Sequence, residues 1–240
     1  MRWLQRLLGR PDYYTLRPDA LPEDAVAAIR AAILESPYMS TNNLNMRFSG
    51  TYGFSVAFRR DALGAVEAAF PAFAPYLKLA LRPDCNAFFL NPLLIANGGA
   101  VLPHHDFSLH SYVPDAPAPE AVSVLYVEVP EGLVGGTFRL YDGERVLAEV
   151  TPQARALLTF RGDLRHAVDA VTSGAPDIYE ARLSLVVEQY RLSDEQLERA
   201  PAMRIGSRRE TAASGRPLEG GVGEGAFGDA LRRMLEGTVD

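Results

Sequence analysis

The chain has little cysteine, no long apolar run and no long basic run, and each absence excludes a class of protein. Cys85 is the only cysteine, so a disulfide within the chain is excluded, a reducing compartment is tolerated, and a buried inert thiol is the simplest interpretation. No apolar stretch reaches the length that spans a bilayer, and nothing gives the basic footprint of a nucleic-acid-binding protein. Arginines interrupt residues 1–10, which therefore do not read as a secretory signal. We expect a soluble cytoplasmic protein without nucleic-acid or membrane partners.

Size and composition favour one large domain. The 240 residues contain 48% hydrophobic side chains, which is typical of a globular protein. We place this domain at residues 1–193, with helical support over residues 1–85 and a β-rich core over residues 86–193. Residues 194–240 then form a carboxy-terminal extension, in which a flexible linker precedes a short helix. This helix, together with a short amphipathic helix at residues 1–10, is a candidate for a homodimer contact.

Hydrophobic periodicity predicts a mainly β fold with supporting helices. Helical spacing of apolar residues occurs at residues 24–34 and 60–70, and residues 46–58 between them are interpreted as a hairpin about a Gly-containing turn. Short strand-like segments divided by turn signals follow at residues 86–95, 101–107, 122–129, 137–141, 146–150, 156–160, 166–171 and 181–190. Many short strands preceded by two helices predict a jelly roll that is buttressed by helices on one face.

A His-x-Asp pair, His104 and Asp106, is the strongest chemical signal in the chain. Residues two apart in an extended strand point to the same face, so these side chains can converge on one point. His166, from a distant strand, would complete a set of two imidazoles and one carboxylate. That set leaves coordination positions open and suits non-haem Fe(II), although catalytic zinc sites also keep an open position. Asp163 and Asp169 are alternative carboxylates, but neither has a histidine at a spacing of two.

Arg182 lies on the last predicted strand of the core and supplies a second signal. Strand alternation places Arg182 and Ser184 on the same face, and either face of that strand can look inward. If the arginine faces into the barrel, a buried guanidinium needs an anion. Glu128 would satisfy it within the protein. A ligand carboxylate, held by the guanidinium fork with Ser184 as an additional donor, is the functional alternative.

Five segments between residues 86 and 190 carry a resemblance to a known family. They are Pro103-His104-His105-Asp106, Val124-Leu125-Tyr126-Val127, Gly135-Gly136-Thr137-Phe138-Arg139-Leu140, His166-Ala167-Val168-Asp169-Ala170-Val171 and Arg182-Leu183-Ser184-Leu185. Together they resemble the Fe(II)/2-oxoglutarate-dependent oxygenases, specifically the prolyl-hydroxylase-like branch. The resemblance implies a double-stranded β-helix with Fe(II) on His104, Asp106 and His166. It also implies that 2-oxoglutarate chelates the iron and places its distal carboxylate on Arg182, assisted by Ser184 and by the hydroxyl of Tyr126.

The activity implied by the resemblance is that of a dioxygenase. With O2 and 2-oxoglutarate, such an enzyme hydroxylates a C–H bond of an amino acid, a peptidyl residue or a small metabolite and releases succinate and CO2. Tyr52, His110 and Arg139 are candidate substrate contacts. The chain departs from the family at residues 94–95, where many relatives have a tyrosine, and in an additional stretch at residues 175–179.

Two alternatives stay open on the sequence alone. One is a metal-dependent jelly-roll enzyme that does not use 2-oxoglutarate. The other is a non-enzymatic jelly-roll module that binds a small carboxylate through Arg182.

Overall fold

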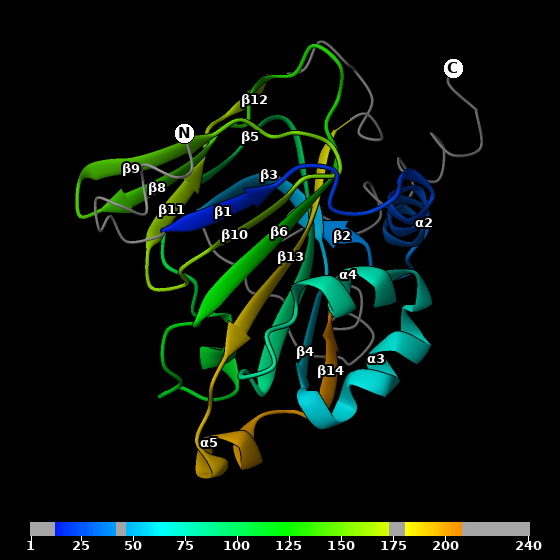
Figure 1. The fold of residues 1–240 in the computed structure, drawn as a ribbon, viewed down its shortest axis with the longest axis vertical. Helices are drawn as coiled ribbons and strands as arrows, with labels where there is room; N and C mark the ends of the chain where they lie inside the picture. The colour runs from blue at the N-terminus through cyan, green and yellow to red at the C-terminus, as the bar shows by residue number, and fades with distance from the viewer. Residues whose placement is uncertain (1–12, 42–46, 173–180, 208–240) are drawn as a thin grey trace. The chain divides into compact units, whose positions relative to one another are not determined.

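The computed structural model describes residues 13–41, 47–172 and 181–207 (Figure 1). Three sequence-based predictions lie outside these residues: the segment at residues 1–10, the additional stretch at residues 175–179, and the linker and helix that follow residue 207. The predicted homodimer contact through the terminal helices therefore stays a prediction, as does the domain boundary at residue 193.

One curled antiparallel sheet forms the core, and the long strand β5 joins its two halves (Figure 1). The first part of β5 belongs to the half of order β10-β6-β13-β5, and its last part belongs to the half of order β5-β11-β8-β9. The core strands are β5 (Ala87–His104), β6 (Ala121–Glu128), β8 (Phe138–Asp142), β9 (Arg145–Val150), β10 (Leu157–Phe160), β11 (Arg165–Val168) and β13 (Arg182–Tyr190). This interleaved order is that of a double-stranded β-helix, so the predicted fold class is confirmed.

β5 replaces two of the predicted strands, at residues 86–95 and 101–107, with a single one. The glycine in the predicted turn between them does adopt a conformation that favours glycine, because Gly98 has a φ of +79°. A glycine inside a strand commonly marks a bend or a bulge. Here it lies between the part of β5 that pairs with β13 and the part that pairs with β11, so the bend lets one strand pair in both halves of the sheet.

The predicted hairpin at residues 46–58 is wrong in its pairing. β3 (Phe48–Gly53) and β4 (Ser55–Arg59) are separated only by Phe54, and both pair with β5 instead of with each other. Gly53 permits a close approach between strands, because a Cβ at this position would lie 2.0 Å from the carbonyl oxygen of Pro92. Gly53 thus marks a place where two backbones meet, and the Gly-containing turn of the predicted hairpin does not join β3 to β4.

Short strands extend the core sheet at its edges, apart from β7 and β12, which form a separate two-stranded sheet. β1 (Tyr14–Arg17) pairs with β10, β2 (Ser40–Thr41) with β3, β14 (Met203–Gly206) with β4, and β7 (Val134–Gly135) with β12 (Val171–Thr172). β14 follows α5 (Asp194–Arg199), which begins with a capping box between Ser193 and Gln196. Residues beyond 193 thus add a helix and a strand to the fold.

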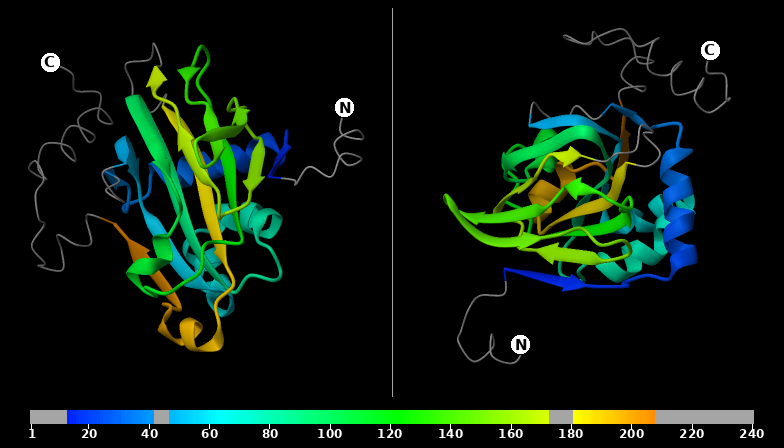
Figure 2. Two further views of the ribbon diagram at one scale, coloured as in Figure 1. Left: turned by 90° about the vertical axis from the view of Figure 1, so that its left-hand side faces the viewer. Right: turned by 90° about the horizontal axis from the view of Figure 1, so that it is seen from above.

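Three helices, α2 (Glu23–Leu34), α3 (Leu63–Ala69) and α4 (Ala74–Ala80), lie on one side of the sheet that contains β6 and β13 (Figure 2). α2 buries Val26, Ile29 and Ile33, whose spacing places them on one helical face. Each of these side chains contributes about 1.5–3 kcal/mol by its removal from water. They share one core with Leu183, Leu185 and Val187 of β13. The short 3-10 helices are η1 (Arg60–Ala62), η2 (Pro71–Phe73) and η3 (Ser108–Ser111).

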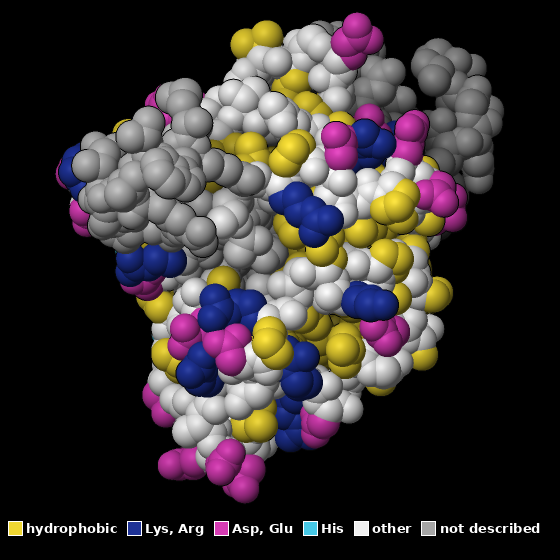
Figure 3. Space-filling model, in the orientation of Figure 1, with side chains coloured by type: hydrophobic (Ala, Val, Ile, Leu, Met, Phe, Trp, Pro, Cys, Tyr) yellow, Lys and Arg dark blue, Asp and Glu magenta, His cyan; other side chains and the backbone are white. Residues whose placement is uncertain are grey.

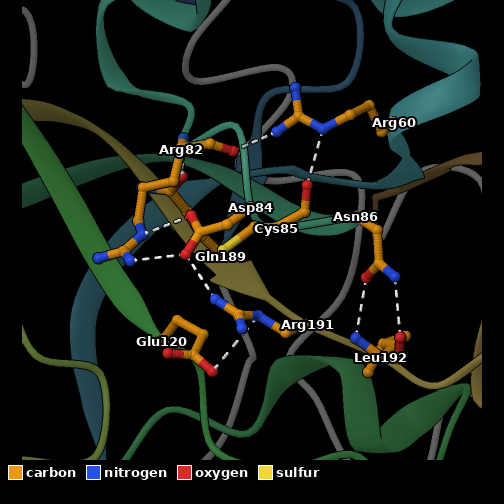
Figure 4. A network of polar contacts seen from close by, with 9 residues as sticks. All are labelled: Arg60, Arg82, Asp84, Cys85, Asn86, Glu120, Gln189, Arg191 and Leu192. Carbon is orange, nitrogen blue, oxygen red and sulfur yellow. Dashed lines mark hydrogen bonds and ion pairs between the residues drawn. The ribbon is translucent and has the colours of Figure 1, made fainter.

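Polar contacts tie together the segment before β5 and the segment after β13 (Figure 4). Asn86 donates to the carbonyl oxygen of Leu192 at 2.8 Å and accepts from the amide of the same residue at 2.8 Å. Asp84 accepts from Arg82 at 3.0 Å and also pairs with Arg191. These contacts fix the two neighbouring strands at the end remote from Arg182, the first residue of β13.

Acidic and basic side chains are interspersed on the face of the molecule shown in Figure 3. Several of the arginines pair with acidic neighbours, as Arg30 does with Glu128 and Arg161 with Asp163. This face therefore carries no broad patch of one sign. Within the described residues, no helix has the length and apolar character needed to cross a membrane.

Candidate metal and carboxylate site

The structure brings the three predicted metal ligands together. His104 ends β5 and stands directly opposite His166 of β11 in the antiparallel register, while Asp106 follows two residues later. Opposite residues of paired strands project side chains to the same face, and the two imidazole ring centroids lie 4.4 Å apart. One ligand atom of each of the three residues lies within 4.8 Å of the others. All three side chains are buried.

The hydrogen bonds of the two histidines orient their rings toward Asp106. Nδ1 of His104 lies 2.9 Å from the carbonyl oxygen of Leu102, and Nδ1 of His166 lies 3.2 Å from that of Leu164. A carbonyl oxygen can only accept, so each Nδ1 carries a proton and Nε2 is the ring nitrogen that faces Asp106. These Nε2 atoms lie 3.3 Å and 3.5 Å from the carboxylate oxygens of Asp106. A metal cation held between these atoms would bind the two imidazoles and the carboxylate together.

The protonation states of His166 and Asp106 suit the binding of a metal cation. Burial lowers the pKa of His166 to about 4, and the opposing influence of Asp106 is smaller, so this imidazole is neutral at pH 7. Burial by itself would raise the pKa of Asp106, but His166 and His104 together bring it below its ordinary value. Two imidazole nitrogens and one carboxylate, which leave further coordination positions open, are a donor set for Fe(II) or for a catalytic Zn(II).

Arg182 presents a buried guanidinium that no acid neutralises within the described residues. Its side chain is 2% exposed, and its Nε lacks a hydrogen-bond partner there. The alternative partner within the protein, Glu128, pairs instead with Arg30. Gly136 helps to make room for the arginine, because it has a φ of +67° and a Cβ there would lie 3.3 Å from Cδ of Arg182. The buried charge therefore calls for an anion that the described residues do not supply.

Two more unpaired donors accompany this guanidinium. The hydroxyl oxygens of Ser184 and Tyr126 are buried and, among the residues that the structure describes, have no partner in hydrogen-bonding geometry, although Arg182 lies close enough to Tyr126 to oppose the effect of burial on its pKa. Cζ of Arg182 lies 5.2 Å from the centroid of the Tyr126 ring. Burial raises the pKa of Tyr126, which therefore keeps its proton and remains a donor. Unpaired buried hydroxyls are costly, and a carboxylate could accept hydrogen bonds from both hydroxyls and from the guanidinium.

One cavity connects the histidine–aspartate cluster with Arg182. Its volume is about 530 Å³, and its lining includes His104, Asp106, His166, Arg182 and Ser184. The face of β13 that carries the arginine thus looks into the double-stranded β-helix, which settles the orientation that alternation left open. Tyr126 is not among the lining residues.

The weaker sequence candidates take other roles. None of the three predicted substrate contacts, Tyr52, His110 and Arg139, is among the described residues that line the cavity. Nε2 of His110 bonds to the carbonyl oxygen of Ala116 at 2.8 Å, and Arg139 pairs with Asp169 at 2.8 Å. The alternative metal-binding carboxylates are accordingly engaged elsewhere, since Asp163 likewise pairs with Arg161.

Several residues that line the cavity were not predicted to belong to the site. They are Phe89 and Asn91 on β5 and Glu188 on β13, whereas Phe107 belongs to the loop at residues 107–119 that the sequence placed at the border of the mouth. Period-two alternation starting from Arg182 already places Glu188 on the same strand face, so this signal was present in the sequence. The others depend on the pairing of β3, β5 and β13, which a single sequence does not specify.

Comparisons with known proteins give structural similarity only. No protein-family model and no curated protein matches the sequence. A prolyl-4-hydroxylase from Pseudomonas putida is similar in structure, with 17% identity, a TM-score of 0.49 and coverage of 79% of this chain and 97% of that protein. For an oxidoreductase of the 2OG-Fe(II) oxygenase family from Burkholderia pseudomallei, the identity is 15%, the TM-score 0.49 and the coverage 77% and 88%. For a viral collagen prolyl hydroxylase from Paramecium Bursaria Chlorella virus-1, in complex with 2OG, the identity is 13%, the TM-score is 0.45, and the match covers 77% of this chain and 98% of that protein.

Proposed function

We propose that this protein is an Fe(II)- and 2-oxoglutarate-dependent dioxygenase. Its proposed reaction hydroxylates a C–H bond of an amino acid, a peptidyl residue or a small metabolite, with release of succinate and CO2. One observation carries the proposal: a histidine–aspartate cluster and an unpaired buried arginine line the same cavity. A metal site alone would not require the arginine, and a carboxylate-binding module would not require the cluster.

His104, Asp106 and His166 are the residues that would hold the metal. Their Nε2 atoms and carboxylate face one another across 3.3–3.5 Å, a spacing that suits a divalent cation bound by all three. The backbone carbonyls that accept from Nδ1 hold both rings in place. Bound Fe(II) would supply O2 activation coupled to oxidative decarboxylation of 2-oxoglutarate.

Arg182, Ser184 and Tyr126 would hold the distal carboxylate of 2-oxoglutarate. The guanidinium provides the charge, and the two hydroxyls, which have no partner within the described residues, provide directed donors. Fixing this end orients the 2-oxo acid end toward the histidine–aspartate cluster in the shared cavity. Aromatic rings around the cluster, among them Phe160 at 4.8 Å from His166 between centroids, limit the access of water.

Calorimetric titration of 2-oxoglutarate, with and without Mn(II) in place of the iron, tests the proposal. The proposed function predicts binding that requires both the metal and Arg182. Equal affinity without metal would instead support a carboxylate-binding module. Metal binding without any uptake of 2-oxoglutarate would support a metal enzyme that does not use this co-substrate.

A further inference from the structure

Glu188 is a buried acid that lines the cavity and has no role in the proposed function. Its side chain lines the cavity and is 5% exposed. It lies six residues beyond Arg182 on the same face of β13, which corresponds to about 20 Å along an extended strand. Among the described lining residues, only Asp106 is a second carboxylate. Arg182 and Glu188 therefore lie at opposite ends of the β13 segment that lines the cavity, whose lining also includes Arg47.

The partners of this acid are all uncharged. Oε1 accepts from the hydroxyl of Ser108 at 2.5 Å, while Oε2 accepts from the amide of Ser108 at 3.3 Å and from the hydroxyl of Tyr190. A carboxylate can accept about four hydrogen bonds, so Oε1 keeps capacity for one more. Within the described part of the chain, no arginine, lysine or histidine forms an ion pair with Glu188.

The immediate surroundings of Glu188 favour a cation over water. Phe89 of β5 and Val122 of β6 stand directly opposite Glu188 in the two strand registers, and both line the cavity. Phe107, which is 44% exposed, and Tyr112 bring further aromatic rings to the same lining. Aromatic faces attract ammonium and guanidinium groups. Burial, with a smaller contribution from Asp106, raises the pKa of Glu188 to about 8, so the acid holds a proton at pH 7 unless a cation replaces it.

We propose that Glu188 recognises a cationic group of the substrate, either a protonated amine or a guanidinium. This inference rests on the proposed function, because that function assigns the Arg182 end of the cavity to 2-oxoglutarate. A five-carbon acid held between Arg182 and the metal site leaves the Glu188 end to the substrate. The cation would take the remaining acceptor position on Oε1 and the adjacent aromatic faces.

The test compares a cation with its neutral isostere on the full-length protein. The protein is loaded with Mn(II) and 2-oxoglutarate, so that neither Asp106 nor Arg182 is left to bind the probe. Butylguanidinium and butylurea are then titrated, and the paramagnetic broadening of their methyl protons reports binding near the metal. We expect butylguanidinium to bind at least about tenfold more tightly, since a hydrogen bond to a charged group is stronger than one to a neutral group.

Two variants separate charge recognition from support of the neighbouring turn. Glu188→Gln keeps the shape and removes the charge, and we expect the preference for butylguanidinium to fall below about twofold. Tyr190→Phe removes one neutral donor to the same carboxyl and keeps the charge, so the preference should remain. Thermal unfolding of each variant checks that it is folded, and the comparison of the two probes on the unmodified protein needs no variant.

The outcomes distinguish this inference from the proposed function. If 2-oxoglutarate binds but the two probes bind equally, recognition of a cation is refuted and Glu188 serves only to hold Ser108. A preference that persists in Glu188→Gln would also refute it. If 2-oxoglutarate itself does not bind, the proposed function fails, whatever the probes do.

Discussion

Replacing Tyr126 by phenylalanine should stabilise the metal-free protein and weaken the binding of 2-oxoglutarate. The Tyr126 side chain is fully buried, and its hydroxyl has no partner among the described residues. An unsatisfied buried hydroxyl costs about 1–3 kcal/mol. Removing it should raise the free energy of unfolding by about that amount, which for a protein of this size corresponds to a rise of about 2–12 °C in Tm.

The same substitution removes a donor to the distal carboxylate. A hydrogen bond to a charged group contributes about 1.5–3 kcal/mol, so the Kd of 2-oxoglutarate should increase by about tenfold to 150-fold. Calorimetry in the presence of Mn(II) measures the affinity, and thermal unfolding of the metal-free protein measures the stability. The variant should thus gain stability while it loses affinity for 2-oxoglutarate, and a general loss of packing cannot produce that combination.

Tyr76 offers a matched control. It is also fully buried, but its hydroxyl donates to the carbonyl oxygen of Ser123 at 2.8 Å. Tyr76→Phe should therefore lower the free energy of unfolding by about 0.5–1.5 kcal/mol and leave the affinity for 2-oxoglutarate unchanged. If Tyr126→Phe instead behaved like Tyr76→Phe, the reasoning about unpaired donors at Arg182 would be refuted.

Three further results are expected. Arg182→Met should weaken 2-oxoglutarate binding by about 100-fold or more, because a buried ion pair loses one partner, without lowering the Tm of the metal-free protein; an unchanged Kd would contradict the assigned role. Asp106→Ala should abolish Mn(II) binding as followed by electron paramagnetic resonance, and retained tight binding would show that the ion sits elsewhere. Burial, with a smaller effect of Asp106, raises the pKa of Glu188 to about 8 from an ordinary value of 4.5, and the adjacent Tyr190 remains neutral because its pKa is also raised. Between these two pKa values the folded protein binds a proton that the unfolded chain has released, so this group makes the free energy of unfolding fall as the pH rises. The Tm of Glu188→Gln minus that of the parent protein should therefore be larger at pH 8 than at pH 5. An equal difference in Tm at the two pH values would exclude the shift.

The sequence predicted that His104, Asp106 and His166 converge, as they do in the structure, because the spacing reflects backbone geometry; their binding of a metal stays a prediction. His104 and Asp106 are two apart, and His166 was placed with them by its position in a series of strands. The structure adds the reason, which is that His104 and His166 are register partners on neighbouring strands. Register between distant strands is set by tertiary packing, so the sequence could suggest this pairing and could not prove it.

Glycine and proline act through tertiary structure at two places where the prediction differs from the structure. The hairpin predicted at residues 46–58 does not form, and Gly53 in this segment permits close contact with Pro92. α4 was not predicted, although Pro75 lies in its first turn, where a missing amide proton costs nothing. The orientation of Arg182 could not be predicted either, because both faces of β13 are buried in separate cores and alternation alone does not say which face looks into the cavity.

Anaerobic addition of Fe(II) and 2-oxoglutarate to the metal-free protein tests the central claim most directly. Chelation of 2-oxoglutarate by iron on His104, Asp106 and His166 should produce a weak charge-transfer band in the visible region. The account predicts that this band appears with both additions, is absent with either alone, and is lost in His166→Ala. Confirmed Fe(II) binding with no band, at saturating 2-oxoglutarate, would contradict it.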